Sequence, residues 1–121
     1  MTAIEGEGTR ELVRRYADAA AIHGGATERG EHVKGNAAHE VISSVYRELR
    51  RRGPDAQRAL LDLLGDPDLG VRCWAASHAL EFSPLDGERV LSEVASLPKS
   101  LAGFSARMTL KQWRDGKLRF P

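Results

Sequence analysis

Hydrophobic residues recur every three or four positions along most of the chain, a spacing that predicts helices. From Thr9 to His23 an apolar stripe follows one helix face, and Gly24-Gly25 is expected to end that helix. Five further helices are expected over residues 36–52, 54–64, 68–82, 84–97 and 101–114. No segment shows the alternation of apolar and polar residues that is typical of a strand. The pattern therefore predicts an all-α chain of about six helices in antiparallel hairpins.

The helix expected over residues 68–82 differs from the others, because it has no strongly polar face. One side carries large and small apolar residues, namely Val71, Trp74, Ala75, Ala79 and Phe82. The opposite side carries Cys73, Ala76, Ser77 and Leu80, none of which bears a long charged group. A helix of this kind is usually enclosed by neighbours on both sides. We therefore expect it at the centre of the stack.

Glycines and polar residues divide the rest of the chain. Residues 1–8 are expected to form a flexible lead-in, and residues 26–35 a long mobile loop. Residues 117–121 are expected to form a C-terminal tail. With 121 residues in all, the chain has room for one core, so residues 9–116 are expected to fold as a single domain.

Residues 60–80, LLDLLGDPDLGVRCWAASHAL, join a leucine-rich helix to an alanine-rich helix through an Asp-Pro-Asp turn. A shift of 30 residues places Phe104 on Trp74 and Leu110 on Leu80, as expected of a solenoid repeat, although two amphipathic hairpins can agree by chance. In these residues the chain resembles the HEAT repeats. The whole pattern is similar to a family of small single-domain bacterial HEAT-like proteins of unknown function. The resemblance implies a short α-α superhelix and a binding role, and it supplies no catalytic residue.

Charge is balanced over the chain, with 18 basic and 17 acidic residues and a net charge of +1. Such a balance gives no general field that would favour nucleic acid or an anionic membrane. No apolar run approaches the roughly 20 residues of a membrane span, and the first residues do not resemble a secretory signal. We therefore expect a cytoplasmic protein without a membrane partner.

The sharpest charged feature is the run Arg47-Glu48-Leu49-Arg50-Arg51-Arg52. Four arginines in six residues suit phosphate binding, but they also suit a solvated helix end, where basic side chains favour the helix dipole. If the chain binds a protein, we expect Arg47, Arg50 and Arg51 to form one part of the interface. Trp113 and Arg114, on the last helix, are expected at its far edge.

Histidine and cysteine point to packing more than to chemistry. His23 and His78 lie on or beside apolar stripes, and the four histidines lack the spacing of a helical metal site. Cys73 is the only cysteine, which excludes an internal disulfide, and its mid-helix position does not favour a thiolate. We therefore expect no catalytic residue, metal or cofactor.

The leading hypothesis is a non-catalytic protein-binding module, expected to be a monomer or a weak homo-oligomer. A concrete version, which rests on analogy with small helical solenoids, is a cytoplasmic immunity protein that neutralises a partner toxin. One alternative is a nucleic-acid-binding protein that uses the arginine-rich helix face. Another is an enzyme similar to HEAT-like lyases or glycosylases, for which no acidic or aromatic constellation is evident. The sequence does not name the partner.

Overall fold

In the computed structural model, which describes residues 3–121, the chain is built of helices alone. The elements in chain order are α1 (Ala3–Gly6), α2 (Thr9–Arg29), α3 (His32–Arg52), α4 (Pro54–Arg58), the 3₁₀ helix η1 (Ala59–Gly65), α5 (Leu69–Phe82), α6 (Pro84–Ala95) and α7 (Leu101–Arg114). No strand occurs among residues 3–121, so the predicted all-α class is confirmed.

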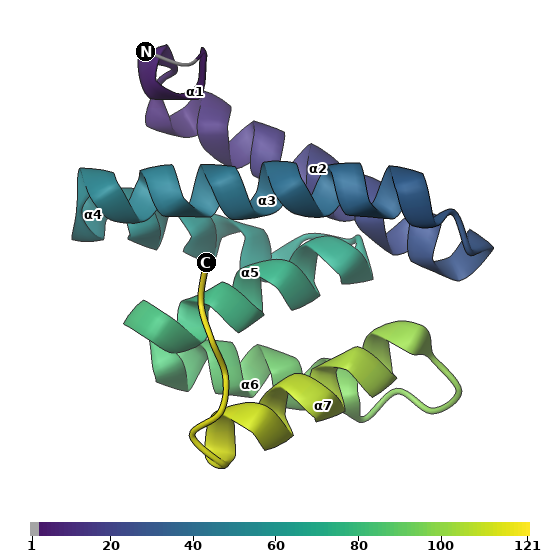
Figure 1. Cartoon of the computed structure of the whole chain (residues 1–121). Helices are drawn as coiled ribbons and strands as arrows, with labels where there is room; N and C mark the ends of the chain where they lie inside the picture. The colour runs from purple at the N-terminus through teal and green to yellow at the C-terminus, as the bar shows by residue number, and fades with distance from the viewer. Residues whose placement is uncertain (1–2) are drawn as a thin grey trace.

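The helices are stacked in layers that follow the order of the chain. The long α2 and α3 form an antiparallel pair at one end, α5 lies in the middle, and α6 and α7 form the opposite end (Figure 1). The helix expected over residues 54–64 is divided into α4 and the tighter η1, which packs on α5. The helices at the two ends of the stack are therefore joined mainly by their contacts with α5.

The prediction that Gly24-Gly25 ends the first helix was wrong. Helix α2 continues to Arg29, and only Gly30 and Glu31 separate it from α3, so the mobile loop expected over residues 26–35 is mostly helical. The chain turns instead at Gly30, which has the left-handed φ of +70°. A Cβ at Gly70 would lie 3.0 Å from the Ala20 carbonyl oxygen and 3.5 Å from the Cα of Gly24, so glycine at position 70 permits close approach of α2 to α5. This packing offsets the low helix propensity of glycine.

Helix α5 is the shared wall of two apolar clusters. Val71 and Ala75 belong to a cluster with α2 and α3, whereas Ala76 and Leu80 belong to a cluster with α6 and α7. The helix begins as predicted at the Asp-Pro-Asp turn, because the Asp68 carboxylate accepts a hydrogen bond of 3.1 Å from the Val71 N–H. The expected central position of this helix is therefore confirmed.

Two glycines allow the helices that follow α5 to approach closely. A Cβ at Gly87 would lie 2.6 Å from the Ala76 carbonyl oxygen and 2.9 Å from the Leu80 nitrogen. A Cβ at Gly103 would lie 2.5 Å from the Leu97 carbonyl oxygen. Since these neighbours are backbone atoms that cannot rotate away, both positions require the absence of a side chain.

The two ends of the chain are tied to the body more than the sequence suggested. Of the expected lead-in, residues 1–2 lie outside the described residues, and α1 follows them. The Arg52 side chain donates hydrogen bonds of 3.2 Å to the carbonyls of Ile4 and Glu5. At the other end, the extended residues 117–121 run back along the stack toward α3 (Figure 1). None of the helices described is both long enough and apolar enough to cross a bilayer.

Replacement of Gly87 by alanine is expected to destabilise the fold. The added methyl group would overlap the backbone of α5, which costs about 1–3 kcal/mol and exceeds the gain of up to about 1 kcal/mol in helix propensity. Gly65→Ala is the matched control, because nothing lies within 4 Å of its Cβ position. Urea unfolding followed by circular dichroism measures both variants. Equal stability of Gly87→Ala and the parent would contradict the close contact.

Candidate functional site

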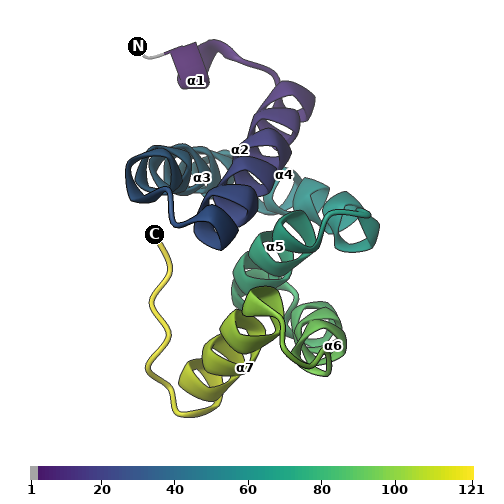
Figure 2. The ribbon, with the colours of Figure 1, turned by 90° about the vertical axis from the view of Figure 1, so that its right-hand side faces the viewer.

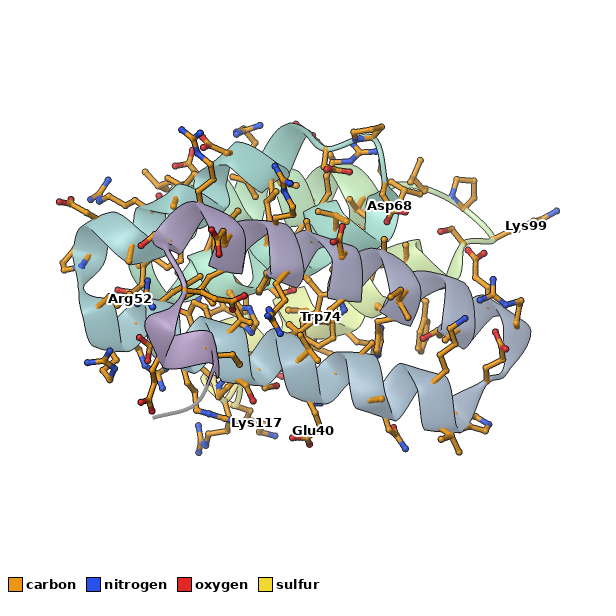
Figure 3. All side chains as sticks on the ribbon, turned by 90° about the horizontal axis from the view of Figure 1, so that it is seen from above. Glu40, Arg52, Asp68, Trp74, Lys99 and Lys117 are labelled. Atoms are coloured by element: carbon orange, nitrogen blue, oxygen red, sulfur yellow. The ribbon has the colours of Figure 1, made fainter. Side chains whose placement is uncertain are left out.

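A cavity of about 720 Å³ lies on one side of α5. Its walls come from five segments: the second half of α2, His39 of α3, the half-buried side of α5 with the turn before it, the first half of α7, and the tail. Trp74 marks its position, since Figure 3 shows this side chain in the middle of the molecule, between α2 and α3. The volume falls within the range of about 300–1,000 Å³ that is usual for ligand pockets.

Small residues on α5 open this cavity. Gly70, Cys73 and Ser77 recur at helical spacing along the side of α5 that lines it. Large apolar side chains in place of Cys73 and Ser77 would fill the space that the cavity occupies, whereas a Cβ at Gly70 would meet the Ala20 carbonyl oxygen at 3.0 Å. The Cys73 thiol contacts the Ala102 carbonyl oxygen at 3.7 Å, and burial raises its pKa to about 11. Cys73 is therefore a protonated thiol at neutral pH, in agreement with the predicted packing role.

Rings from three helices surround Trp74. Its indole N–H donates a hydrogen bond of 3.3 Å to Nδ1 of His23. The Trp74 ring meets the His39 ring edge-on at 5.5 Å between centroids, and the His78 ring lies 5.7 Å away. Because the indole only donates, Nδ1 of His23 is the acceptor and the proton of the neutral imidazole is on Nε2. Burial and the nearby His39 lower the pKa of His23, so the uncharged imidazole is favoured at neutral pH.

His78 is the most deeply placed of these rings, with 3% of its surface exposed. Its ring stacks on Tyr46 with centroids 4.1 Å apart, and a hydrogen bond of 2.6 Å joins its Nδ1 to the Tyr16 hydroxyl. Burial, with smaller contributions from His39 and Arg50, lowers the pKa of His78 to about 3. The predicted packing role of this histidine agrees with these contacts.

A polar network continues from Tyr46 to the surface of α3. The Tyr46 hydroxyl donates to Glu81 at 2.5 Å and accepts from the Gln57 amide at 3.1 Å. Arg50 donates to both oxygens of Glu81, at 3.1 and 3.3 Å, and its guanidinium lies 5.6 Å from the centroid of the Tyr46 ring. Arg50 also donates to the carbonyl of Pro121, the last residue of the tail. It therefore has a clear role within the chain.

The arginine run is paired with acidic residues of its own chain. Glu48, with 7% of its side chain exposed, accepts from Arg51 at 2.8 and 2.6 Å and from Arg52 at 2.7 Å. Hydrogen bonds from these two guanidinium groups lower the pKa of Glu48 to about 2. Arg47 is exposed and lies 3.3 Å from the Ser44 hydroxyl. Glu48 was not identified from the sequence as the partner of these arginines, although it precedes Arg51 and Arg52 by three and four residues, a spacing that favours ion pairs on a helix.

The predicted interface residues on the last helix lie in another part of the molecule. Trp113 is half-buried against the second apolar cluster, and Arg114 donates to Glu88 of α6 at 3.2 Å. Helix α5 lies between α3 and α7 (Figure 1). The structure therefore brings the three arginines together on α3 and the other two residues together on α7, but not the two groups with each other.

Besides the charged Glu28, Asp68 and Arg119, the cavity offers the neutral imidazoles of His23 and His78 together with indole, thiol and hydroxyl groups. These groups stack and form neutral hydrogen bonds. No cluster of three or more His, Cys, Asp or Glu residues suited to a metal ion occurs within the described part of the chain. The sequence analysis noted the histidines but not their convergence, because His23, His39 and His78 are on three different helices. The lack of a polar face on α5 was the only signal available.

Comparison with known proteins places the chain in a family. The sequence model of DUF2019, a domain of unknown function, matches residues 10–113, so the chain belongs to this family. A search of curated proteins gave no significant match. The crystal structure of the protein RPA1889 from Rhodopseudomonas palustris CGA009 is similar over 100% of both chains, with a TM-score of 0.90 and 24% identity. The chain shares the fold of that protein, and the resemblance to HEAT repeats stays a prediction.

The buried His78 is expected to make stability fall in mild acid. Its pKa is about 3 in the folded chain and about 6.5 when unfolded, so below pH 6.5 only the unfolded state binds a proton there. Its contribution is fully present above pH 6.5 and decreases as the pH falls, with a slope approaching about 1.4 kcal/mol per pH unit. Urea titrations between pH 7.5 and 5 avoid most carboxylate titration. His78→Gln should reduce the slope, whereas His32→Gln, at an exposed position, should preserve it; equal slopes would contradict the assignment.

Reversal of charge at Arg51 is expected to differ from reversal at Arg47. Arg51→Glu removes two hydrogen bonds to Glu48 and places a like charge one turn away, so the melting temperature should fall and the pKa of Glu48 should rise from about 2. Arg47→Glu should leave the melting temperature within about two degrees, as is usual for exposed sites. Thermal melts and a carboxylate titration by nuclear magnetic resonance measure these effects. An unchanged Glu48 pKa in Arg51→Glu would contradict the pairing.

Proposed function

We propose that this member of the DUF2019 family is a non-catalytic protein-binding module that contacts its partner through α7. The observation that carries the proposal is an apolar stripe on this helix. Leu101, Phe104 and Met108 are 51%, 57% and 43% exposed, and their spacing places them on one helix face. A row of large apolar side chains facing water is typical of an interaction site.

Charge on the same helix specifies the kind of partner. Residues 101–114 include Arg107, Lys111 and Arg114 and no acidic residue. At 100° per residue these basic side chains lie beside the apolar stripe, on the side away from the cavity. Lys111 and Arg114 are paired with Asp115 and Glu88, whereas Arg107 donates to the Ala95 carbonyl. We therefore expect the partner to place an acidic residue opposite Arg107, beside its apolar patch, since complementary charge speeds association and selects partners.

The residues expected at the interface from the sequence have different roles in this proposal. Arg114 belongs to the α7 surface, and the half-buried Trp113 supports it from beneath. Arg47 and Arg51 are exposed on α3, apart from α7, and make at most a separate contact. Arg50 is held by Glu81 and the tail and is better placed to support the fold than to meet a partner.

An immunity protein is a specific form of this proposal. In that form the partner is a toxin, and the α7 surface covers a region that the toxin needs. Support comes from analogy with small helical binding proteins. A toxin gene directly beside the gene of this chain would favour it, and co-expression would then have to protect cells from that toxin.

The other functions considered from the sequence receive less support. Nucleic-acid binding relied on the arginine run, and three of its four arginines are bonded to Glu48 or Glu81. A role in nucleophilic catalysis is disfavoured for Cys73 by its raised pKa. His78, which is almost fully buried, is poorly placed to touch a substrate.

Loss of the α7 stripe is expected to abolish partner binding. Tagged wild-type chain, the Phe104→Ser/Met108→Ser variant and the Val33→Ser variant are each used to capture proteins from the native cell, followed by mass spectrometry. Val33 is the matched control, because it is 84% exposed but lies on α3. The double variant should fold normally and bind the partner at least about tenfold more weakly, since each apolar anchor of an interface is worth 1 kcal/mol or more.

Support requires a protein that the wild type and Val33→Ser both retain and that the double variant loses. The dissociation constant of the purified partner then has to show the same order. A purified partner that binds all three chains equally would contradict the α7 surface.

A further inference from the structure

The tail, residues 117–121, lies along the open side of the cavity. It leaves α7 through Gly116, whose φ of +73° reverses the chain, and then runs in an extended form past α5 toward α3 (Figure 2). Leu118 and Phe120 are half-buried and pack against the second apolar cluster. Lys117, which precedes Leu118, and Arg119, which lies between Leu118 and Phe120, are exposed. Alternation of this kind is that of an extended peptide with one face on a surface.

The far end of the tail is held by a single side chain. Arg50 donates to the carbonyl of Pro121 and is itself fixed by Glu81 and the ring of Tyr46. Arg50 therefore acts as a preformed donor for the main chain of an extended peptide. This contact does not depend on which side chain the peptide carries at that position.

The tail extends across the stack, but it makes few interactions with the rest of the protein. Within the described residues, the backbone of residues 118–121 makes no hydrogen bond to another backbone group. Leu118 and Phe120 remain partly exposed, and about 720 Å³ of cavity remains beside them. Few contacts and an exposed backbone are the features of a segment that opens at low cost in free energy.

The walls of the cavity indicate what the open site would bind. Trp74 and the apolar cluster supply apolar surface, and Glu28 and Asp68 supply negative charge. The tail offers two apolar side chains with a basic residue, Arg119, between them. The same pattern in another chain would satisfy the same walls.

We propose that this cavity is a peptide-binding groove, and that its ligand is an extended segment of a partner protein with two apolar residues flanking a basic one. The tail is its built-in competitor and leaves when the segment enters. The proposal goes beyond the α7 surface and does not rest on it. Binding at α7 can fail while the groove stands, and the reverse also holds.

The test uses the full chain with a loosened tail and a synthetic probe. Leu118→Ser/Phe120→Ser removes the two apolar contacts and leaves the chain length unchanged. The probe is a labelled, capped peptide of residues 115–121, Asp-Gly-Lys-Leu-Arg-Phe-Pro, followed by fluorescence polarisation. Since an occupied site weakens apparent affinity by the fraction of time that it is open, the variant should bind the probe at least about tenfold more tightly than the wild type.

Two controls separate groove binding from other effects. Lys117→Ser changes an exposed residue of the same tail that does not line the cavity, and it should bind the probe as weakly as the wild type. A probe with serine in place of its leucine and phenylalanine should bind neither chain. Loss of stability in the loosened variant without probe binding would mean that the tail is only a structural strap, which overturns the proposal. Equal binding by wild type and variant would overturn it as well.

A second measurement covers a variant that does not fold. The backbone amide resonances of Leu118 and Phe120 in the isotopically labelled wild-type chain are followed as the unlabelled probe is added to millimolar concentration. This range matches the effective concentration of about 1 mM expected of a tethered tail. A saturating shift of these two resonances supports the groove, and resonances that do not move overturn it.

Discussion

Close approach of helices to α5 is the constraint on which the rest of the structure depends. Ala75, Ala76 and Ala79 are completely buried and present little more than backbone to their neighbours. Glycines allow the neighbouring helices to come close to α5. Gly70 of α5 meets Gly24 of α2 on one side, and Gly87 of α6 meets Ala76 of α5 on the other. Because these contacts involve backbone atoms, they set the spacing of the layers more strictly than flexible side chains would.

The small side chains of α5 also create the candidate site. Where α5 faces α2 and α6 its small residues are covered, but between α2 and α7 they are not, and the cavity results. The rings of Trp74 and His78 project from α5 on this side and are joined to His23, Tyr16 and Tyr46 by hydrogen bonds and stacking. Binding in the groove and binding at the α7 surface would thus both affect α5, which contacts α2 in one outer layer and α6 and α7 in the other.

Local signals in the sequence predicted what local interactions decide. The beginning of α5 at Asp68, the apolar faces of α5 and the all-α class were readable because each depends on residues within one or two turns. Gly24-Gly25 misled, since the contact that keeps α2 helical comes from Gly70, 46 positions along the chain. The cavity could not be predicted, because its groups converge from five segments. The arginine run was recognised, but its partner Glu81 is 31 positions from Arg50.

Native-state hydrogen exchange of the backbone amides tests the central role of α5 most directly. If α5 is the shared wall of both clusters, its amides from Cys73 to Leu80 should exchange only by global unfolding, with the highest protection in the chain. Amides of α7 and the tail should exchange through smaller openings that leave α5 protected. Exchange of the α5 amides as fast as those of α7, at a free energy well below that of global unfolding, would contradict this account.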